Sequence, residues 1–581
     1  MSIHPLDALV ILVYLGLMLA IGLAFSRRAG SSTQEFFLSG RSLPWFVAGT
    51  SMAATTFASD TPLVVTELVR RQGIGGNWIW VNFAISHVVT TFLLARLWRR
   101  SGVTTDVELC ELRYSGRGAA CLRAFKGLFY ALVTNVVVLG WVILGMTAIA
   151  GIFGVPKLVT LAACIVLASL YASLAGLWGV VLTDLLQLAV ALTGAVILAV
   201  KVLAAEGGLS GLRERLPALA DAAGEPAARL APLAGFDWAS PGFRGAFMGF
   251  AVAVLVQWWS WKYSDGGGVL IQRMNSSRSE RDSLLATLWF AVVTYVIRPW
   301  PWYLVALVSL WVLPDMADHK AVYPAMMARY LGPGLLGLVL ASMLAAFMST
   351  IDTHMNLASS YFVHDVYRRF IKRDAGERHY VAIARWSGIG IVVLGSLVAW
   401  RSTSISALFT FLLQLVAGAG AVFLLRWFWW RINAWSEISA MLASLLVASL
   451  LNLANEGRWF AHHFASWEIF LWNVGLSGAV WLAVAFLAPP TDEEHLRRFV
   501  ARTRPLGLWP ARLWPDGRRR PLGASAGRTW ANILGGVALI YGLLFGAGQA
   551  LFGRAPQAAL LLGAALAGGL VLARNLRREP A

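Results

Sequence analysis

Two apolar stretches of the sequence carry clusters of oxygen-bearing side chains. The first covers residues 49–62 and combines small residues, several hydroxyls, the carboxylate of Asp60 and a proline. Pro62 has no amide hydrogen and clashes with the preceding helical turn, so we expect the helix to break there. The carbonyls that a broken helix exposes suit a hard cation such as sodium. A kinked helix whose hydroxyls bond to its own backbone would give the same pattern.

The second stretch covers residues 346–353. Ala346, Ser349, Thr350 and Thr353 share one face at helical spacing. Hydroxyls also join ordinary membrane helices, so they do not by themselves indicate a site. The carboxylate of Asp352 is harder to explain in that way, because within a membrane it needs a cation, a proton or an arginine as its partner. We therefore favour a functional role for this stretch.

Three further polar positions give weaker signals. Asp184 falls at the start of an apolar span, where it could simply be interfacial. Arg298 falls near the middle of a span, where it could bind an anionic substrate or pair with a buried carboxylate such as Asp60, and we favour pairing. Gln257 and Trp258 lie deeper in their span than the aromatic residues that follow. The aromatic residues of this run could form an interfacial belt, a wall that stacks on the substrate or a gate, and for Trp261 and Tyr263 we favour the belt.

The surrounding composition predicts that membrane-spanning helices hold these residues. Of the 581 residues, 58% are hydrophobic and 13% are charged, against about 25% charged in a typical soluble domain. Apolar runs of about 20 residues, the length that crosses the hydrocarbon core, recur along the whole chain. The predicted spans are 7–26, 43–66, 78–97, 124–151, 157–175, 180–204, 243–260, 284–313, 329–365, 382–400, 404–425, 436–455, 468–488, 529–551 and 556–574. The span 329–365 is too long for one crossing, so we expect its C-terminal end to continue into water.

The charge pattern predicts the orientation of the chain. The formal net charge is +18, and the Arg and Lys residues cluster in alternate connections, which is the positive-inside pattern of an integral membrane protein. A nucleic-acid role is not expected, because no soluble basic domain is present to carry it. Arg27, Arg28 and Arg41 follow the first span and no Arg or Lys precedes it, so we expect the N-terminus to lie outside. An odd number of spans then places the C-terminus in the cytoplasm. The membrane is expected to be the inner or plasma membrane of the cell.

An intramembrane enzyme is one class of function to weigh. Asp60, Asp184 and Asp352 could act as acid and base groups. No histidine cluster, metal set or nucleophile accompanies them in the sequence, so we do not expect an enzyme.

Several stretches are similar to motifs of the sodium:solute symporter family. The segment 175–178, followed by 183–187, resembles the family's GGL…TDxxQ signature with Ala175 in place of the first glycine. The other similar stretches are 36–44, 108–114, 271–273 and 337–365. The similarity covers roughly residues 5–435, and the motifs are specific when taken together.

The resemblance implies an all-α polytopic membrane fold with a LeuT-like core of two inverted five-helix repeats. One extra helix precedes this core and about four follow it. The implied parts are an N-terminal helix and loop at 1–42, a first repeat at 43–204, an extracellular loop at 205–242, a second repeat at 243–425, and C-terminal helices at 426–581 with a cytoplasmic loop rich in Arg and Pro at 489–528.

The resemblance also implies a sodium site between the first and eighth core helices. Carried over by position, backbone carbonyls of Ala54, Phe57 and Ala346 and the hydroxyls of Ser349 and Thr350 would bind the ion.

Some members of the family bind a second sodium. The corresponding residues here are Asp184, Asp352 and Thr353. Because Asp352 stands where the family has a serine, this second cation site could bind sodium more tightly, take a proton or pair internally.

The expected substrate position is lined by polar and aromatic residues. Thr56 stands where sugar carriers have Asn and proline carriers have Asp, and Phe409 lies near the position of the sugar carriers' Gln, which argues against a typical sugar or proline pocket. The other substrate residues are Asp60, Thr61, Gln257, Trp258 and Arg298.

The implied function is sodium-coupled symport of a small organic solute by alternating access. The alternative is a membrane sensor that keeps the transporter fold without net transport.

Overall fold

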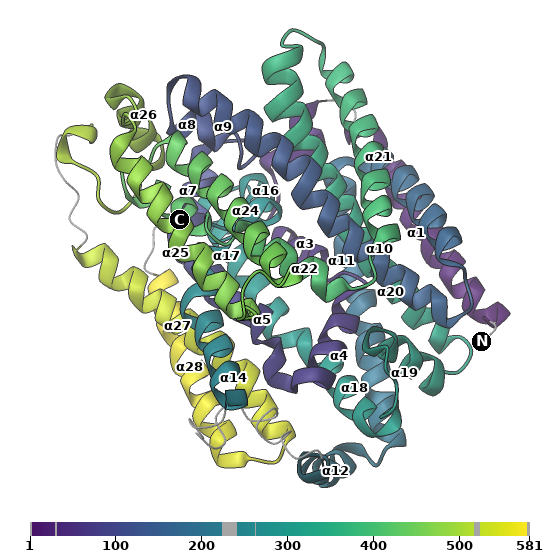
Figure 1. Cartoon of the computed structure of the whole chain (residues 1–581). Helices are drawn as coiled ribbons and strands as arrows, with labels where there is room; N and C mark the ends of the chain where they lie inside the picture. The colour runs from purple at the N-terminus through teal and green to yellow at the C-terminus, as the bar shows by residue number, and fades with distance from the viewer. Residues whose placement is uncertain (1–2, 30–31, 223–240, 262, 516–522, 578–581) are drawn as a thin grey trace.

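The structure is a computed structural model that describes residues 3–29, 32–222, 241–261, 263–515 and 523–577. Ten helices in these ranges are long and apolar enough to cross a membrane, or eleven when one bent pair of helices counts as a span. Figure 1 shows these helices packed side by side as a bundle. Of the predicted loop 205–242, residues 223–240 lie outside the described residues.

The bounds of the main helices follow the predicted spans closely. Several spans are made of two or three consecutive helical segments. The helices are α1 (Pro5–Ala29), α3 (Trp45–Thr55), α4 (Thr61–Gln72), α6 (Phe83–Val89), α7 (Ala95–Ser101), α9 (Gly116–Phe129), α10 (Asn135–Ile152), α11 (Lys157–Ala205), α12 (Gly208–Ala222), α14 (Pro241–Val252), α15 (Trp258–Ser260), α16 (Gly267–Ser276), α17 (Glu280–Val292), α18 (Pro299–Val312), α19 (Val322–Tyr330), α20 (Leu335–Ser360), α21 (Glu377–Arg401), α22 (Ile405–Val416), α23 (Gly420–Phe428), α24 (Ala434–Glu456), α25 (Ser466–Leu487), α26 (Glu493–Thr503), α27 (Gly523–Leu551) and α28 (Ala555–Arg577).

The span that carries Asp60 is broken, but not at the proline. Helix α3 ends at Thr55 and α4 begins at Thr61, so residues 56–60 form the break. Pro62 lies in the first turn of α4, where its missing amide hydrogen costs nothing and its fixed φ favours a helix. The predicted break at Pro62 is therefore wrong by several residues, and the proline starts the second half of the span.

A second break opens the other half of the core. Helix α15 ends at Ser260 and α16 begins at Gly267. Gly266 and Gly267 have φ values of 121° and 73°, a backbone conformation that favours glycine. The glycine-rich exit therefore interrupts this span, as predicted.

Helix α11 covers two predicted spans, 157–175 and 180–204. At 1.5 Å per residue a straight helix over residues 157–205 would be about 74 Å long, more than twice the hydrocarbon thickness. Lys157 donates to carbonyls at the C-terminal end of α21, where Lys320 from the α18–α19 connection also donates. At the other end, Glu206 accepts a hydrogen bond from Trp311 of α18. Lys320 follows α18 and Trp311 lies near the C-terminal end of α18. Both ends of α11 therefore lie near the C-terminal end of α18, at one face of the molecule, as two crossings require.

Helix α20 is the centre of the bundle. It continues without interruption into a π-helical segment (Tyr361–Ile371), in agreement with the expected extension past one crossing. In its most apolar window 89% of the residues are buried, against 22% for the C-terminal helix α28. Helix α20 is therefore enclosed by protein, which allows it to carry polar side chains at membrane depth.

The two ends of the chain lie at opposite faces. The carboxylate of Asp7, in the first turn of α1, accepts from the amides of Gly334 and Gly337 after α19. The turn between α27 and α28 contacts Arg213 of α12, so it lies at that same face, and α28 then returns to the other. This arrangement agrees with an odd number of crossings; which face is extracellular stays a prediction.

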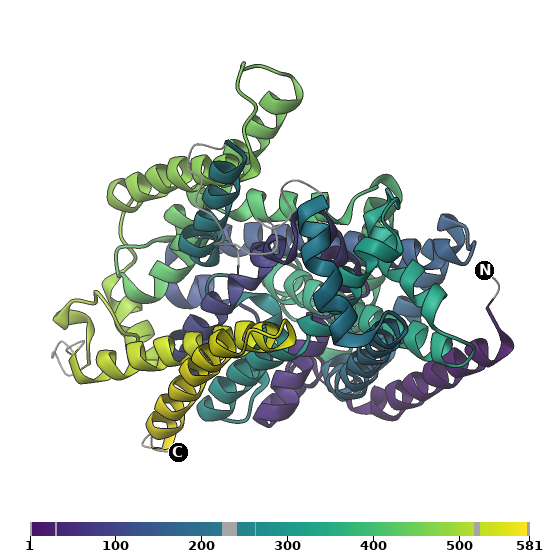
Figure 2. The ribbon, with the colours of Figure 1, turned by 90° about the horizontal axis from the view of Figure 1, so that it is seen from below.

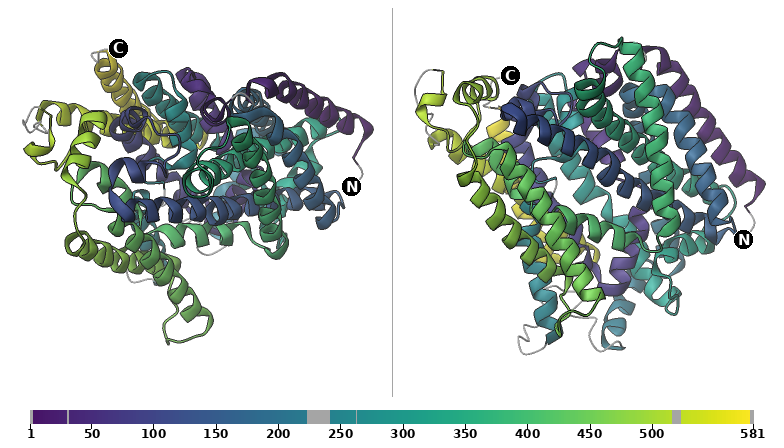
Figure 3. Two further views of the ribbon diagram at one scale, coloured as in Figure 1. Left: turned by 90° about the horizontal axis from the view of Figure 1, so that it is seen from above. Right: turned by 45° about the horizontal axis from the view of Figure 1, so that its top comes forward.

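The C-terminal helices α24, α25, α27 and α28 gather on the side of the core opposite α1, as Figures 2 and 3 show. A buried ionic cluster joins α24 to that core. Glu437 of α24 binds Lys126 of α9 at 3.0 Å and Arg426 of α23 at 3.4 Å, and it accepts from Tyr114. Arg426 also pairs with Asp265 in the second break. The first C-terminal helix is thus part of the packed core.

Candidate functional site

Asp184 of α11 joins the two polar stretches singled out from the sequence. Its carboxylate accepts a hydrogen bond from Ser51 of α3 on one oxygen and from Ser349 of α20 on the other. The side chain is fully buried. Asp184 is therefore not interfacial, because it lies inside the bundle between two helices that supply its hydrogen bonds.

Helix α20 also contacts the end of α3 directly. The hydroxyl of Thr350 lies 2.9 Å from the carbonyl oxygen of Thr55 and 3.1 Å from that of Ala346. The hydroxyls of Thr353 and Thr55 are 3.0 Å apart. The last turn of α3 and the polar turns of α20 therefore face each other across a short distance.

The residues expected at the main sodium site come together at this junction. Ala54 lies in the last turn of α3, and its carbonyl accepts from the amide of Phe57, which lies in the break. The carbonyl end of a helix carries a partial negative charge. Because Ser349 and Thr350 donate their protons to other oxygens, the lone pairs of their own oxygens stay free to accept a cation.

The donor set fits a hard monovalent cation better than a transition metal. Carbonyl and hydroxyl oxygens are ligands that alkali and alkaline-earth cations prefer. Across the described parts of the chain, no group of three or more His, Cys, Asp or Glu side chains is placed to hold a metal ion.

Arg273 of α16 enters the same junction, and sequence reasoning missed it. The fully buried guanidinium donates to Thr353 at 2.7 Å and to Ser51 at 3.2 Å, and it lies 3.7 Å from the carboxylate of Asp184. Its other close partner is the side-chain oxygen of Gln272 at 2.7 Å. The motif at 271–273 was the available signal, but it indicated a loop and not a side chain inside the bundle.

Asp352, the carboxylate of α20 that stands where the family has a serine, is 1% exposed. Neither of its oxygens has a hydrogen-bond partner among the described residues. The three alternatives for Asp352 were tighter sodium binding, protonation and internal pairing. The described residues show no internal pairing.

Arg298 does not pair with Asp60, contrary to the favoured prediction. Its guanidinium donates to the carbonyl of Ala53 and to the hydroxyl of Thr56, both at 2.9 Å. It also lies over the rings of Phe57 and Trp302, with centroid distances of 5.7 and 5.6 Å. The carbonyl of Ala53, the hydroxyl of Thr56 and two aromatic rings therefore hold this guanidinium, and the carboxylate of Asp60 does not.

Asp60 lies at the other end of the break, where α4 begins. One carboxylate oxygen is buried without a hydrogen-bond partner among the described residues. Helix α10 packs closely here: a Cβ added to Gly145 would lie 2.9 Å from the Cβ of Asp60. The neighbouring Thr61 accepts from the amide of Ala58, which holds the broken segment in its conformation.

Gln257 and Trp258 lie on the other broken span. Gln257 donates to the carbonyl of Ile79 at 2.9 Å, and Trp258 packs against a buried aromatic cluster. In that cluster Trp261 stacks on Phe83 at a centroid distance of 3.5 Å and is only 7% exposed. The assignment of Trp261 to an interfacial belt is therefore wrong, because its ring packs inside the bundle.

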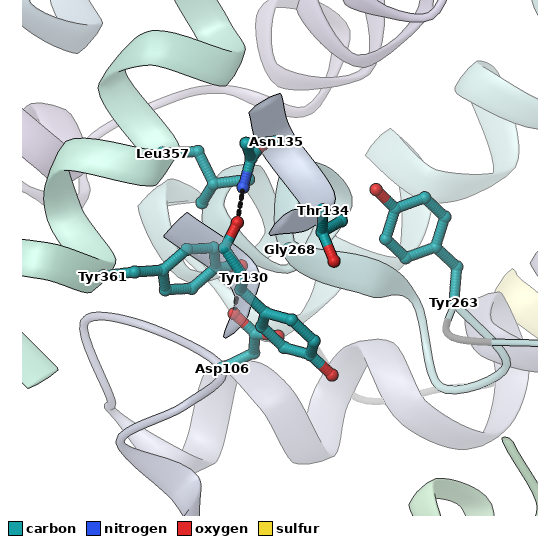
Figure 4. A pocket seen from close by; sticks show the side chains of 8 residues that line it. All are labelled: Asp106, Tyr130, Thr134, Asn135, Tyr263, Gly268, Leu357 and Tyr361. Carbon is teal, nitrogen blue, oxygen red and sulfur yellow. Dashed lines mark hydrogen bonds between the residues drawn. The ribbon is translucent and has the colours of Figure 1, made fainter. Parts of the chain in front are cut away.

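A cavity of about 10 Å³ lies beside these spans (Figure 4). It is lined by Asp106, Tyr130, Thr134, Asn135, Tyr263, Gly268, Leu357 and Tyr361. Tyr361 closes one side by donating to Asp106 at 2.6 Å. A space of this size holds about one water molecule and no organic solute.

Comparison with known proteins agrees with this architecture. A sodium/glucose cotransporter of Vibrio parahaemolyticus is 24% identical over 77% of this chain and 85% of its own length. The sodium/mannose cotransporter SLC5A10 of Bos taurus is 25% identical over 86% of this chain and 90% of its own. The structure of a Na+-coupled sialic acid symporter in a substrate-bound outward-open state has a TM-score of 0.65 at 20% identity, over 84% of this chain and 99% of that one. The expected LeuT-like fold is thereby confirmed.

The model of the sodium:solute symporter family matches residues 36–444, which include both broken spans, Asp184 and the polar turns of α20. The chain belongs to the sodium:solute symporter family.

Proposed function

We propose that the chain carries a small organic solute across the cell membrane together with sodium, by alternating access. The observation that carries this proposal is the junction of α3, α11 and α20. There, buried hydroxyls of Ser349 and Thr350 direct their protons to Asp184 and to a carbonyl, beside the open end of a broken helix. Such a set of oriented oxygens has a cation as its natural ligand.

In this proposal the carbonyls of Ala54, Phe57 and Ala346 and the hydroxyls of Ser349 and Thr350 bind sodium. Asp184 orients Ser349 and supplies negative charge without touching the ion. Sodium bound between α3 and α20 favours the arrangement in which these helices are closed together, so it shifts the population of states. A membrane potential of 100 mV supplies about 2.3 kcal/mol for each sodium that enters.

The solute would bind beside the first break, among Thr56, Asp60, Thr61, Gln257, Trp258 and Arg298. The unpartnered oxygen of Asp60 and the aromatic-flanked guanidinium of Arg298 offer polar contacts to a solute. The matched relatives are named for glucose, mannose and sialic acid. Thr56 and Phe409 replace residues that sugar carriers use, so we propose a different small solute. The two repeats would be 43–204 and 243–425, with the N-terminus outside and the C-terminus in the cytoplasm.

The test starts with a thermal-shift screen of small organic solutes on the purified protein, with and without sodium. Solutes that stabilise the protein only with sodium are then assayed for uptake and counterflow in proteoliposomes. The double variant Ser349→Ala and Thr350→Ala should lose sodium-stimulated uptake and keep membrane insertion. Ser342→Ala on the same helix, whose hydroxyl donates to the carbonyl of Val339 one turn earlier, is the matched control.

Unchanged sodium dependence in the double variant would contradict the assignment of the site. Solute binding without any counterflow would favour a sensor that keeps the transporter fold.

A further inference from the structure

A buried guanidinium and a buried carboxyl group lie at the two ends of the first break and do not pair with each other. Arg298 donates to Thr56, the first residue of the break, and Asp60 is its last residue. We propose that the transported solute is of amino-acid type, with a carboxylate that binds Arg298 and an amine that binds Asp60. This inference rests on the proposed function and names the chemical class of its solute.

The guanidinium of Arg298 lacks a counter-charge. It is 3% exposed, and both of its hydrogen bonds run from Nη1 to uncharged oxygens, those of Ala53 and Thr56. Among the described residues no carboxylate pairs with it, and Nε is buried without a hydrogen-bond partner. Arginine stays protonated in proteins, and a buried charge is costly unless it is compensated. The edge formed by Nε and Nη2 suits a carboxylate, which arginine binds through two parallel hydrogen bonds.

The carboxyl group of Asp60 also lacks a partner. The side chain is 7% exposed, its Oδ1 atom is buried without a hydrogen bond to the described residues, and it does not cap α4. Whether ionised or protonated, a carboxyl group keeps an oxygen that accepts a hydrogen bond. An amine of the solute supplies the missing donor, and an ammonium group also supplies positive charge.

The short break keeps the two groups close to each other. The chain advances four residues from Thr56 to Asp60, which span at most about 14 Å when fully extended. Hydrogen bonds from the amides of Phe57 and Thr61 to carbonyls three residues earlier turn the chain at both ends and shorten this distance. Arg298, held at Thr56, and Asp60 are therefore close enough for one small solute to contact both.

Other classes of solute satisfy these two groups less completely. A sugar offers hydroxyls to both but no charge to compensate Arg298. A simple carboxylate leaves the acceptor oxygen of Asp60 without a donor, and a simple amine leaves Arg298 without an anion. An amino acid satisfies both groups at once, so its affinity should exceed that of either analogue.

The first experiment measures solute binding to the purified full-length protein in sodium by thermal shift. The probes are the common α-amino acids, β-alanine and γ-aminobutyrate. For each probe that binds, the carboxylic acid and the amine of the same skeleton are measured as well. We expect at least one amino acid to bind, and each analogue to bind about 10- to 150-fold more weakly, because it loses one charge-assisted contact.

Two results would overturn this inference: no binding by any of these amino acids, or equal binding by an analogue. If sodium-stimulated counterflow is then found for another solute, the inference fails alone. If no solute is coupled to sodium, the proposed function fails with it.

The second experiment assigns each end of the solute to its side chain. Arg298→Gln should weaken binding of the amino acid by about 10- to 150-fold and leave that of the matched amine unchanged. Asp60→Asn should weaken the amino acid and leave the matched carboxylic acid unchanged. Arg278→Gln is the control, because it removes the same charge from a side chain that is 62% exposed and paired with Asp282; it should change none of the three affinities.

A merely structural role of Arg298 or Asp60 would weaken all three ligands alike. Equal losses in a folded variant would therefore overturn the assignment of the two ends. If neither variant folds, the comparison of the three ligands on the unaltered protein decides.

Discussion

Ser349 offers the most direct test of the proposed sodium site. Replacing it by alanine removes one oxygen from the proposed ligands and one hydrogen bond from Asp184. Asp184 keeps its bond from Ser51 and its nearby guanidinium. The carboxylate therefore stays partnered, and we expect the variant to lose about 1.5–3 kcal/mol of stability in the absence of sodium, the usual contribution of a hydrogen bond to a charged group.

The loss in sodium affinity comes in addition to this loss of stability. An interaction with a charged partner contributes about 1.5–3 kcal/mol. At about 1.4 kcal/mol for each factor of ten, this corresponds to a roughly 10- to 150-fold rise in the sodium concentration that half-saturates the protein.

The assay follows the melting temperature of the purified protein against sodium concentration, with choline replacing sodium at constant ionic strength. Ser349→Ala should shift the midpoint of this titration to higher sodium, and Ser342→Ala should leave it in place. A midpoint that does not move, in a variant that is still folded without sodium, would refute the view that Ser349 contacts the ion.

Three further changes test other parts of the architecture. Asp184→Asn leaves Arg273 buried without its counter-charge, so we expect a loss of about 3–5 kcal/mol in stability, measured by thermal unfolding without sodium. Gly145→Ala places a methyl group 2.9 Å from the Cβ of Asp60 and should lower solute affinity in counterflow while the sodium midpoint stays unchanged. Glu437→Gln removes the carboxylate from a buried ionic cluster and should lower the melting temperature in all salts, in contrast to the sodium-specific effect of Ser349→Ala.

Much of this architecture could be predicted because its elements have local signals in the sequence. Apolar length identified the spans, the glycine run identified the second break, and helical spacing placed Ser349 and Thr350 on one face. The break near Asp60 was placed too late because proline is also favoured in the first turn of a helix.

What the sequence could not predict depends on contacts between distant segments. Arg273 and Ser51 are 222 residues apart, and nothing local in either segment indicates that they meet. The same holds for Arg298, whose partners are a carbonyl and a hydroxyl at the end of α3 and not the carboxylate of Asp60. Trp261 was assigned by composition to an aromatic belt, but its stacking on Phe83 is a tertiary contact.

The buried ionic cluster around Glu437 bears on how the chain can be shortened. A chain cut after residue 433 would strip Lys126 and Arg426 of a shared anion at once. Any attempt to obtain a minimal ten-helix carrier therefore has to neutralise Lys126 in the same design. The segment after residue 433 is therefore needed for the stability of the preceding helices, since it supplies the anion that two of their buried cations require.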